Sequence, residues 1–301
     1  MRTAAHAGLL ILSSAWLLSA QRQPLTFDVR WDNPPAIATT LTSHRLLHSA
    51  SMKREVGWNI YLPPRYEASQ VRYPVIYWLH GSGGNESSGL SIAAELDKAI
   101  ASGMVPPVIM VFPNGGKKTE YRDWPDQNIL IETMIVKELI PEVDANFRTI
   151  PSKMGRAIEG MSMGANGALK LALKYPEVFG SVVAYAGSYK RLPLDGYFPG
   201  IALEQQAWIA KLTQWYSPED DPFVLADKNF GRLGDLRIRF IGGTKDVSLP
   251  DAEALHAWLV RCGIPHEYEI LLGVAHDGKA YYEHSGLRGF QFHAAAFARA
   301  R

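Results

Sequence analysis

The sequence predicts an α/β fold with a mostly parallel central sheet and helices on both faces. Continuous apolar runs such as residues 73–79 (YPVIYWL) are typical of strands that are buried on both faces. Segments with apolar residues at helical spacing lie between these runs, and Gly and Pro residues separate the two kinds of segment. From about residue 73 onward strand and helix alternate, which is the pattern of a parallel sheet.

The expected strands begin at residue 55. Residues 55–62 (EVGWNIYL) are β-prone and end at Pro63, because proline cannot donate to a sheet ladder. The run at 73–79 leads into a glycine-rich loop, and so does the run at 105–112 (VPPVIMVF). Further apolar segments predict strands at residues 156–161, 181–186, 236–241 and 266–272.

Helices are expected between these strands. Residues 132–143 carry apolar side chains at helical spacing. Residues 164–175 (GANGALKLALKY) form a second candidate that ends before a proline. A third helix is expected at 251–262, where a glycine follows, and a last one at 285–301.

The chain is predicted to consist of a short leader and one domain. Residues 1–20 contain a positive residue, an apolar stretch and a small residue before a polar run, which is the pattern of a secretory signal peptide. We expect cleavage after Ala20, a secreted or periplasmic protein and no stable membrane insertion; an uncleaved N-terminal anchor is the alternative. Residues 21–301 are expected to form a single domain. Within it residues 192–233, rich in aromatic residues and proline, interrupt the alternation and are interpreted as a cap-like insert.

Composition excludes several classes of protein. Lys and Arg total 31 and Asp and Glu total 30, so a net charge of +1 gives no electrostatic reason to expect nucleic-acid binding. The single cysteine, Cys262, excludes an intramolecular disulfide and any zinc site built from several cysteines. The sequence has no H-E-x-x-H pair, calcium-loop pattern or phosphate-binding G-x-x-x-x-G-K-[ST] motif. We therefore predict no metal site and no cofactor.

A G-x-S-x-G motif, Gly160-Met161-Ser162-Met163-Gly164, lies where a predicted strand leads into a predicted helix. This is the setting of a nucleophile elbow, a sharp turn that exposes the serine at the N-terminus of a helix. The helix dipole and its free N–H groups there favour developing negative charge. Ser162 is therefore the candidate nucleophile.

A serine hydroxyl needs a base, and the best of the nine histidines is His276. It lies in the loop GVAHDG directly after the last predicted strand, on the sheet edge where the elbow is expected. His284 and His293 lie downstream and are the reserve candidates.

The third member of such a site is a carboxylate that fixes the imidazole tautomer. In the chain order serine, acid, histidine it should lie between the elbow and His276. Asp246 fits, because it follows the strand at 236–241 in the loop GGTKD. Asp251 competes, but its place at the start of a helix has an ordinary capping explanation.

Two backbone N–H groups would hold the oxyanion. One is expected from Met163, the residue after the serine, and the other from Gly81 or Ser82 in the glycine-rich loop after the strand at 73–79. His80, at the start of this loop, is interpreted as a structural support for it.

Together these residues resemble the esterase D, or putative esterase, branch of the α/β-hydrolases. That branch includes feruloyl and acetyl xylan esterases of carbohydrate esterase family 1, S-formylglutathione hydrolases, enterochelin esterases and the antigen 85 mycolyltransferases. The resemblance is carried by the segments SASMKREVGWNIYLPPRY (49–66), YPVIYWLHGSGGNES (73–87), AIEGMSMGANGALKLALKYPEVFGSVVAYAGSY (157–189), GGTKD (242–246) and GVAHD (273–277).

The resemblance implies an α/β-hydrolase fold with Ser162 as nucleophile, Asp246 as acid and His276 as base, in agreement with the residue-level assignment. It implies a serine carboxylic-ester hydrolase acting on a small-molecule or polysaccharide ester. Together with the predicted signal peptide, it leads us to expect a secreted enzyme that acts on feruloyl or acetyl esters of plant polysaccharide. The alternatives are an acyltransferase like antigen 85, a siderophore esterase of the enterochelin type, and a non-catalytic binding protein that kept the fold.

Two departures from the family pattern concern the surroundings of the site. Ala165 stands where the family usually has a second glycine, and Gly278 and Lys279 follow the histidine loop where a tryptophan is frequent. Trp124 and Trp215 are candidate substrate-binding residues, because an aromatic ring can stack on a sugar or a phenol. Ordinary packing is the alternative for each of these rings.

Overall fold

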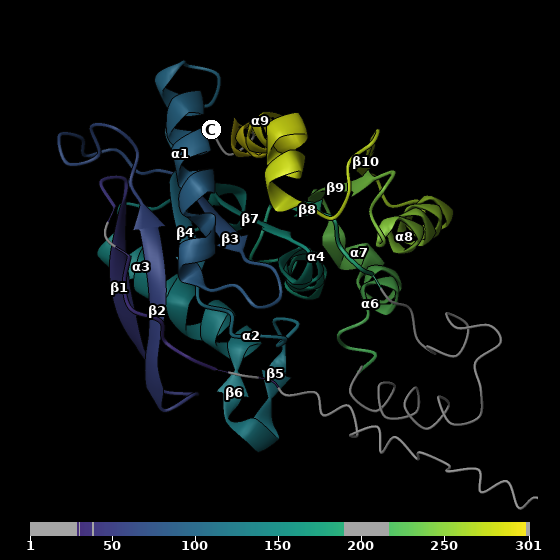
Figure 1. Cartoon of the computed structure of the whole chain (residues 1–301), viewed down its shortest axis with the longest axis horizontal. Helices are drawn as coiled ribbons and strands as arrows, with labels where there is room; N and C mark the ends of the chain where they lie inside the picture. The colour runs from purple at the N-terminus through teal and green to yellow at the C-terminus, as the bar shows by residue number, and fades with distance from the viewer. Residues whose placement is uncertain (1–28, 30, 38, 190–216, 299–301) are drawn as a thin grey trace, which may run out of the picture.

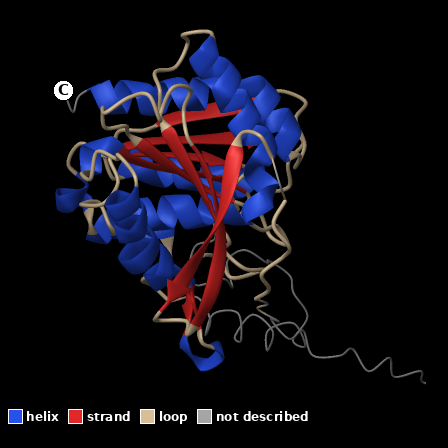
Figure 2. Cartoon of the chain, turned by 90° about the vertical axis from the view of Figure 1, so that its left-hand side faces the viewer, coloured by secondary structure: helices blue, strands red, loops and turns tan. Residues whose placement is uncertain are grey.

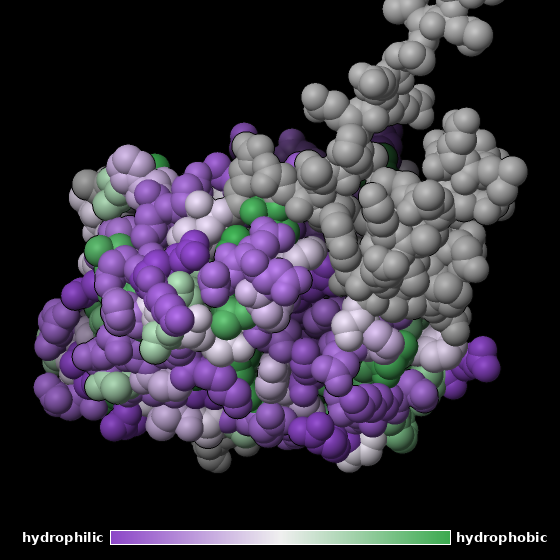
Figure 3. Space-filling model, turned by 90° about the horizontal axis from the view of Figure 1, so that it is seen from below, coloured by the Kyte–Doolittle hydropathy of each residue, from purple (hydrophilic) through white to green (hydrophobic). Residues whose placement is uncertain are grey.

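The computed structural model describes residues 29, 31–37, 39–189 and 217–298 of the 301-residue chain. The predicted signal peptide, the greater part of the cap-like insert and Trp215 lie outside the described residues. No helix of the described part is both long enough and apolar enough to cross a membrane. On the part of the face in Figure 3 that is not drawn grey, most residues are hydrophilic, and hydrophobic residues form only small separate patches.

An eight-stranded sheet runs through the molecule in the order β1-β2-β4-β3-β7-β8-β9-β10 (Figures 1 and 2). The strands β1 and β2 pair antiparallel, and β2 is also antiparallel to β4. From β4 to β10 all neighbours are parallel. The strand bounds are Thr42–Ser49 (β1), Arg54–Tyr61 (β2), Val75–Leu79 (β3), Ile109–Pro113 (β4), Arg156–Met161 (β7), Ser181–Tyr185 (β8), Arg237–Gly243 (β9) and Glu267–Leu271 (β10).

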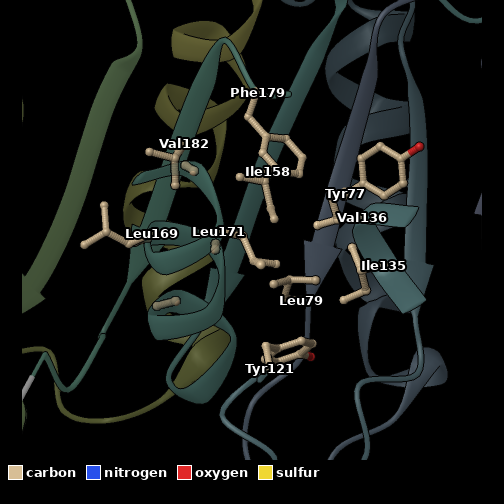
Figure 4. Close-up of a cluster of buried hydrophobic side chains, with 14 of the residues drawn as sticks. Tyr77, Leu79, Tyr121, Ile135, Val136, Ile158, Leu169, Leu171, Phe179 and Val182 are labelled. Carbon is tan, nitrogen blue, oxygen red and sulfur yellow. The ribbon is translucent and has the colours of Figure 1, made fainter. Parts of the chain in front are cut away.

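Helices cover both faces of this sheet, as predicted. The side chains of α1 and α9 pack in one buried hydrophobic cluster. Those of α4 and α8 pack in a second cluster, together with η3, α3 and α6. Figure 4 shows a part of this second cluster, in which Leu169 and Leu171 come from α4 and Ile135 and Val136 from η3. The helix bounds are Leu90–Ala101 (α1), Ile131–Thr133 (α2), Met134–Leu139 (η3), Ile140–Asn146 (α3), Met163–Lys174 (α4), Pro222–Lys228 (α6), Phe230–Leu233 (α7), Leu249–Arg261 (α8) and Gly278–Phe297 (α9).

Shorter elements connect these layers. A small hairpin joins β5 (Asp123–Trp124) to β6 (Ile129–Leu130). Single turns of 3₁₀-helix occur at η1 (Glu86–Gly89), η2 (Pro125–Gln127) and η4 (Lys153–Gly155).

The predicted elements are present, but several boundaries differ. The helix expected at 132–143 spans α2, η3 and α3, and its middle part η3 is a π-helix. The last helix, α9, begins at Gly278 rather than at residue 285. The Asp277 side chain accepts hydrogen bonds from the backbone N–H groups of Lys279 (2.9 Å) and Ala280 (3.4 Å), which caps the helix there.

The sequence analysis missed β1 and α1. The strand β1 is at the edge of the sheet and several of its side chains are exposed, so its sequence, TSHRLLHS, lacks the continuous apolar run of a buried strand. It pairs with β2 over its full length, from Thr42 opposite Tyr61 to Ser49 opposite Arg54. Tertiary pairing rather than local pattern therefore determines this strand.

Candidate active site

Ser162 lies in the turn between β7 and α4, with backbone angles φ 57° and ψ −118°. Such a conformation is strained for a residue other than glycine, and the surrounding structure holds it. The Ser162 N–H donates to the Tyr185 carbonyl oxygen at 2.9 Å, which ties the turn to the next strand. The position is the one expected of a nucleophile elbow.

The glycines on either side of Ser162 are required by close backbone contacts. A Cβ on Gly164 would lie 2.0 Å from the carbonyl oxygen of Leu79, and a Cβ on Gly160 would lie 2.5 Å from the carbonyl of Gly164. Neither backbone can move aside without shifting β3 or α4. Glycine at both positions therefore lets the turn form without these overlaps.

We expect Gly164→Ala to lower the free energy of unfolding by about 3 kcal/mol, because the new methyl group would overlap backbone rather than a flexible side chain. Chemical denaturation of the purified variant measures this loss. Gly231→Ala is the matched control: it lies in α7 with nothing within 4 Å of the added Cβ, and it should change stability by less than about 1 kcal/mol. Equal stability of the two variants would contradict the packing argument.

The structure brings Ser162, His276 and Asp246 together. The Nε2 atom of His276 lies 2.9 Å from the Ser162 Oγ. Its Nδ1 atom lies 3.0 Å from Asp246 Oδ1 and 2.9 Å from Oδ2. A carboxylate can only accept, so Nδ1–H donates to Asp246 and the lone pair of Nε2 is left to accept the serine proton. This arrangement can deprotonate the serine hydroxyl.

Asp246 is buried and accepts hydrogen bonds from several groups besides His276. Its Oδ1 accepts from the backbone N–H of Ser248 at 2.8 Å and from the Ser248 hydroxyl at 2.7 Å. Its Oδ2 accepts from the Tyr281 hydroxyl at 2.9 Å. Burial alone would raise the pKa of the Asp246 carboxyl, but these hydrogen bonds outweigh it and hold the pKa below its ordinary value. The carboxylate therefore stays charged beside the imidazole.

The competing residues are engaged elsewhere. Asp251 is in the first turn of α8 and accepts a hydrogen bond from the Ser188 hydroxyl. The Nδ1 atom of His284 lies 2.8 Å from the carbonyl oxygen of Ala280, one helical turn earlier. His293 is fully buried, with its Nδ1 atom 2.7 Å from the Ser181 Oγ. Among these candidates only His276 and Asp246 connect to Ser162.

The loop after β3 is organised around the buried side chain of His80. Its Nε2 atom accepts the backbone N–H of Gly115 at 2.9 Å, so the ring proton is on Nδ1, which donates to the Gly81 carbonyl oxygen at 2.9 Å. The Gly84 N–H donates to the same oxygen at 3.0 Å. Because a peptide unit is planar and trans, the N–H of Ser82 points opposite to the carbonyl that these donors hold.

This peptide lies beside the serine, since a Cβ on Gly81 would be 3.5 Å from the Ser162 Cβ. Met163 is the first residue of α4, and its N–H has no acceptor within the helix. The amides of Ser82 and Met163 are thus the candidate donors to an oxyanion, and Gly81 supplies the carbonyl that orients one of them.

We expect His80 to make folding stability depend on pH. Burial lowers the pKa of His80 to about 4 from 6.5, and the hydrogen bond to Gly81 offsets only part of that effect. Between these values the unfolded chain takes up a proton that the folded protein does not, so stability falls as the pH falls from 6.5 to about 4. The loss amounts to about 3 kcal/mol.

Urea denaturation at a series of pH values measures this dependence. His80→Asn, which keeps a donor for Gly81, should show a shallower decline than the unaltered protein. His284→Asn, at an exposed position, is the control and should leave the decline unchanged. A decline of the same steepness in all three proteins would assign it to other groups.

The structure shows the surroundings of one of the two candidate substrate-binding tryptophans, Trp124. Trp124 is in β5 and is partly buried; its Nε1–H donates to the Thr119 carbonyl oxygen at 2.9 Å, and the Arg122 guanidinium lies 4.0 Å from its ring centroid. These contacts fix the ring in the hairpin, and a substrate contact remains a prediction.

Two hydrogen-bond donors to Asp246 were missed in the sequence. Ser248 follows Asp246 by two residues, which is the spacing of an Asx turn and a signal that could have been used. Tyr281 lies on α9, five residues after His276, and its contact with Asp246 depends on where that helix begins. No local sequence pattern predicts the contact between Tyr281 and Asp246.

The site was compared with known proteins. A family model described as "Putative esterase" matches residues 49–288. An esterase of Mycobacterium tuberculosis (strain CDC 1551 / Oshkosh) is 34% identical over 157 residues, covering 48% of this chain and 32% of that protein. An endo-1,4-beta-xylanase/feruloyl esterase of Xylanibacter ruminicola is 35% identical over 139 residues, covering 40% of this chain and 18% of that protein.

An S-formylglutathione hydrolase of Bos taurus is 30% identical over 155 residues, covering 46% of this chain and 54% of that protein. The chain therefore spans less than two thirds of the length of these curated relatives. Among solved structures, a ferulic acid esterase aligns with a TM-score of 0.73 at 22% identity, covering 85% of this chain and 98% of that one. An S-formylglutathione hydrolase from Staphylococcus aureus aligns with a TM-score of 0.68 at 19% identity, covering 84% and 98%. At these identities the alignments establish the α/β-hydrolase fold.

Proposed function

Since the chain belongs to the putative esterase family, we propose that it is a serine carboxylic-ester hydrolase that works through an acyl-enzyme on Ser162. The observation that carries the proposal is the hydrogen-bond chain from the Ser162 hydroxyl through His276 to Asp246. Each distance is within the range for proton transfer between positioned groups. A non-catalytic binding protein would not need this chain of contacts.

In the first half of the reaction the Ser162 Oγ attacks the ester carbonyl carbon while its proton passes to His276 Nε2. The carbonyl oxygen becomes an oxyanion, which the N–H groups of Ser82 and Met163 stabilise. Asp246 stabilises the imidazolium that forms, and its lowered pKa keeps it charged for this role.

The tetrahedral intermediate then collapses. The bond from the carbonyl carbon to the alcohol oxygen breaks, and His276 gives its proton to that oxygen, so the neutral alcohol leaves and the acyl group stays on Ser162. Water enters and loses a proton to His276 as it attacks the acyl carbon. His276 then returns this proton to the Ser162 oxygen as the bond between that oxygen and the acyl carbon breaks, which frees the serine and releases the acid.

The substrate proposed for this site is a feruloyl or acetyl ester of plant polysaccharide, met outside the cytoplasm. Two observations support it. The first twenty residues have the pattern of a secretory signal peptide. A curated relative that shares 35% of its residues over the matched segment is named as a xylanase/feruloyl esterase. The name of another relative indicates a glutathione thioester, and the proposed export would separate this enzyme from such a cytosolic substrate.

The experiment is a substrate panel with the purified protein and its Ser162→Ala variant as blank. The panel contains p-nitrophenyl acetate, methyl ferulate, acetylated xylan and S-formylglutathione. Serine-dependent release of ferulate or of xylan acetate would support both the hydrolase and its substrate class. Turnover of S-formylglutathione alone would replace the substrate proposal, and folded protein without any turnover would overturn the function. Transfer of the acyl group to an added sugar in place of water would favour an acyltransferase.

A further inference from the structure

A cleft lies between α1 and α9, and the residue before Ser162 contributes to its lining. The two helices lie side by side on one face of the sheet (Figure 1). The cleft has a volume of about 630 Å³, within the range of roughly 300–1,000 Å³ for small-molecule sites. Its inner end is formed by Gly81, Met161 and Gly278. These residues neighbour, in turn, the Ser82 amide, Ser162 itself and the His276 loop, so the cleft reaches the reacting atoms from this side.

The floor of the cleft is apolar and firmly held, although the exposed side chains of Glu95, Lys279 and Glu283 also line the cleft. Trp78, Ile92, Met161 and Tyr282 line it, and each is less than 9% exposed. The Trp78 Nε1–H donates to the Tyr282 hydroxyl oxygen at 2.7 Å, and that hydroxyl donates to the buried carboxylate of Glu159 at 3.1 Å. The polar atoms of both aromatic residues thus have hydrogen-bond partners within the protein. These hydrogen bonds hold the two rings in place, so the apolar surface of the cleft is already formed before a ligand binds.

The recess on the other side of Ser162 is smaller and more polar than the cleft. There α4 lies on the opposite face of the sheet, and a small recess is lined by charged and polar side chains that include Glu120, Arg122 and Asn166. Asn166 belongs to the same turn as the serine, because its N–H donates to the Ser162 carbonyl oxygen at 3.1 Å. An alcohol rich in hydroxyl groups matches this wall, and an apolar group does not.

We propose that the cleft between α1 and α9 binds the acyl group of the ester, and that the natural acyl group is an extended apolar one, aromatic or aliphatic, rather than acetyl. The inference rests on the proposed function and deepens it. Burying the acyl group against Trp78, Ile92 and Tyr282 removes its apolar surface from water. The alcohol then faces the polar wall along α4. An acetyl group ends at the inner edge of the cleft and gains little of this contact.

The first test measures kcat/KM for p-nitrophenyl acetate, butyrate, hexanoate and octanoate, which share one leaving group. We expect kcat/KM to rise by about tenfold or more from acetate to hexanoate, since each buried methylene contributes to binding. A protein that prefers acetate would overturn the inference while leaving the esterase function intact. A parallel series of acetates with longer alkyl alcohols should show no such rise, and a rise confined to that series would assign the cleft to the alcohol.

The second test narrows the cleft. Ser91 is an exposed residue of α1 that lines it, so Ser91→Phe adds a ring to one wall without touching the core. We expect the hexanoate-to-acetate ratio of kcat/KM to fall by about tenfold. Ala101→Phe, on the exposed end of the same helix and away from the cleft, is the matched control and should leave the ratio unchanged. An unchanged ratio in Ser91→Phe would overturn the inference.

A binding measurement separates this inference from the proposed function. Ferulate and hexanoate are titrated calorimetrically into Ser162→Ala and into Ser162→Ala/Ser91→Phe. We expect binding to the first protein and at least about tenfold weaker binding to the second. No binding to either would overturn the cleft assignment even if the unaltered protein hydrolyses esters. Binding without any ester turnover by the unaltered protein would overturn the proposed function and the acyl assignment with it.

Discussion

Ser162→Ala is expected to lower kcat for ester hydrolysis by about a millionfold, the scale found when a triad serine is removed from a serine hydrolase. The hydroxyl is the group that forms the acyl-enzyme in the proposed mechanism, and His276 then has no proton to take from it. Stability should change little, because the hydroxyl is partly exposed and the strained turn is held by backbone contacts. Activity on p-nitrophenyl acetate and the denaturation midpoint measure the two effects.

Mass spectrometry of the labelled protein tests the role of Ser162 as nucleophile without any ester substrate. An alkyl fluorophosphonate should add one group to each chain of the unaltered protein and none to Ser162→Ala. Ser152→Ala is the control and should react like the unaltered protein, because this exposed serine precedes β7 whereas Ser162 follows it. Modification of Ser162→Ala, or its retention of full ester turnover, would place the nucleophile elsewhere.

The fold followed from the sequence because a parallel sheet buried on both faces leaves a local signature. The runs that became β3, β4 and β8 are fully buried and almost entirely apolar, which is the signature of such strands. The strand β7 is equally buried but carries Arg156 and Glu159, so its apolar signal is weaker. The edge strand β1 has water on one side and was missed for that reason. The start of α9 was misplaced because the capping side chain of Asp277 lets the helix begin at Gly278, directly after the histidine loop.

The arrangement of the candidate site was predictable for a topological reason. The carboxyl ends of β7, β9 and β10 meet at one edge of the sheet, so residues in the loops after them are brought together from distant parts of the chain. The support of these residues was not predictable. Tyr281 reaches Asp246, and Tyr282 connects Trp78 to Glu159, only because α9 packs against β7, β8 and β9. The α1–α9 cleft depends on the same packing.

Asp246→Asn should lower kcat by about ten-thousandfold while the protein stays folded, the scale of the same change in another serine hydrolase. The hydrogen bonds around Asp246 explain why. Its Oδ1 accepts the Ser248 backbone N–H, which can only donate, so the amide oxygen of an asparagine must take that position. The amide NH₂ then takes the place of Oδ2 and faces His276 Nδ1 and the Tyr281 hydroxyl.

An NH₂ group in that place forces His276 to accept at Nδ1 and to carry its proton on Nε2, which turns a donor toward Ser162. The serine proton then has no acceptor, although every residue keeps its place. Asp251→Asn is the matched control, since that carboxylate contacts Ser188 rather than the imidazole, and it should retain kcat. Steady-state kinetics of the two variants measure this difference. If Asp246→Asn keeps kcat within about tenfold of the unaltered protein, tautomer control by Asp246 is wrong. Equal losses of kcat in both variants would point to a general loss of structure.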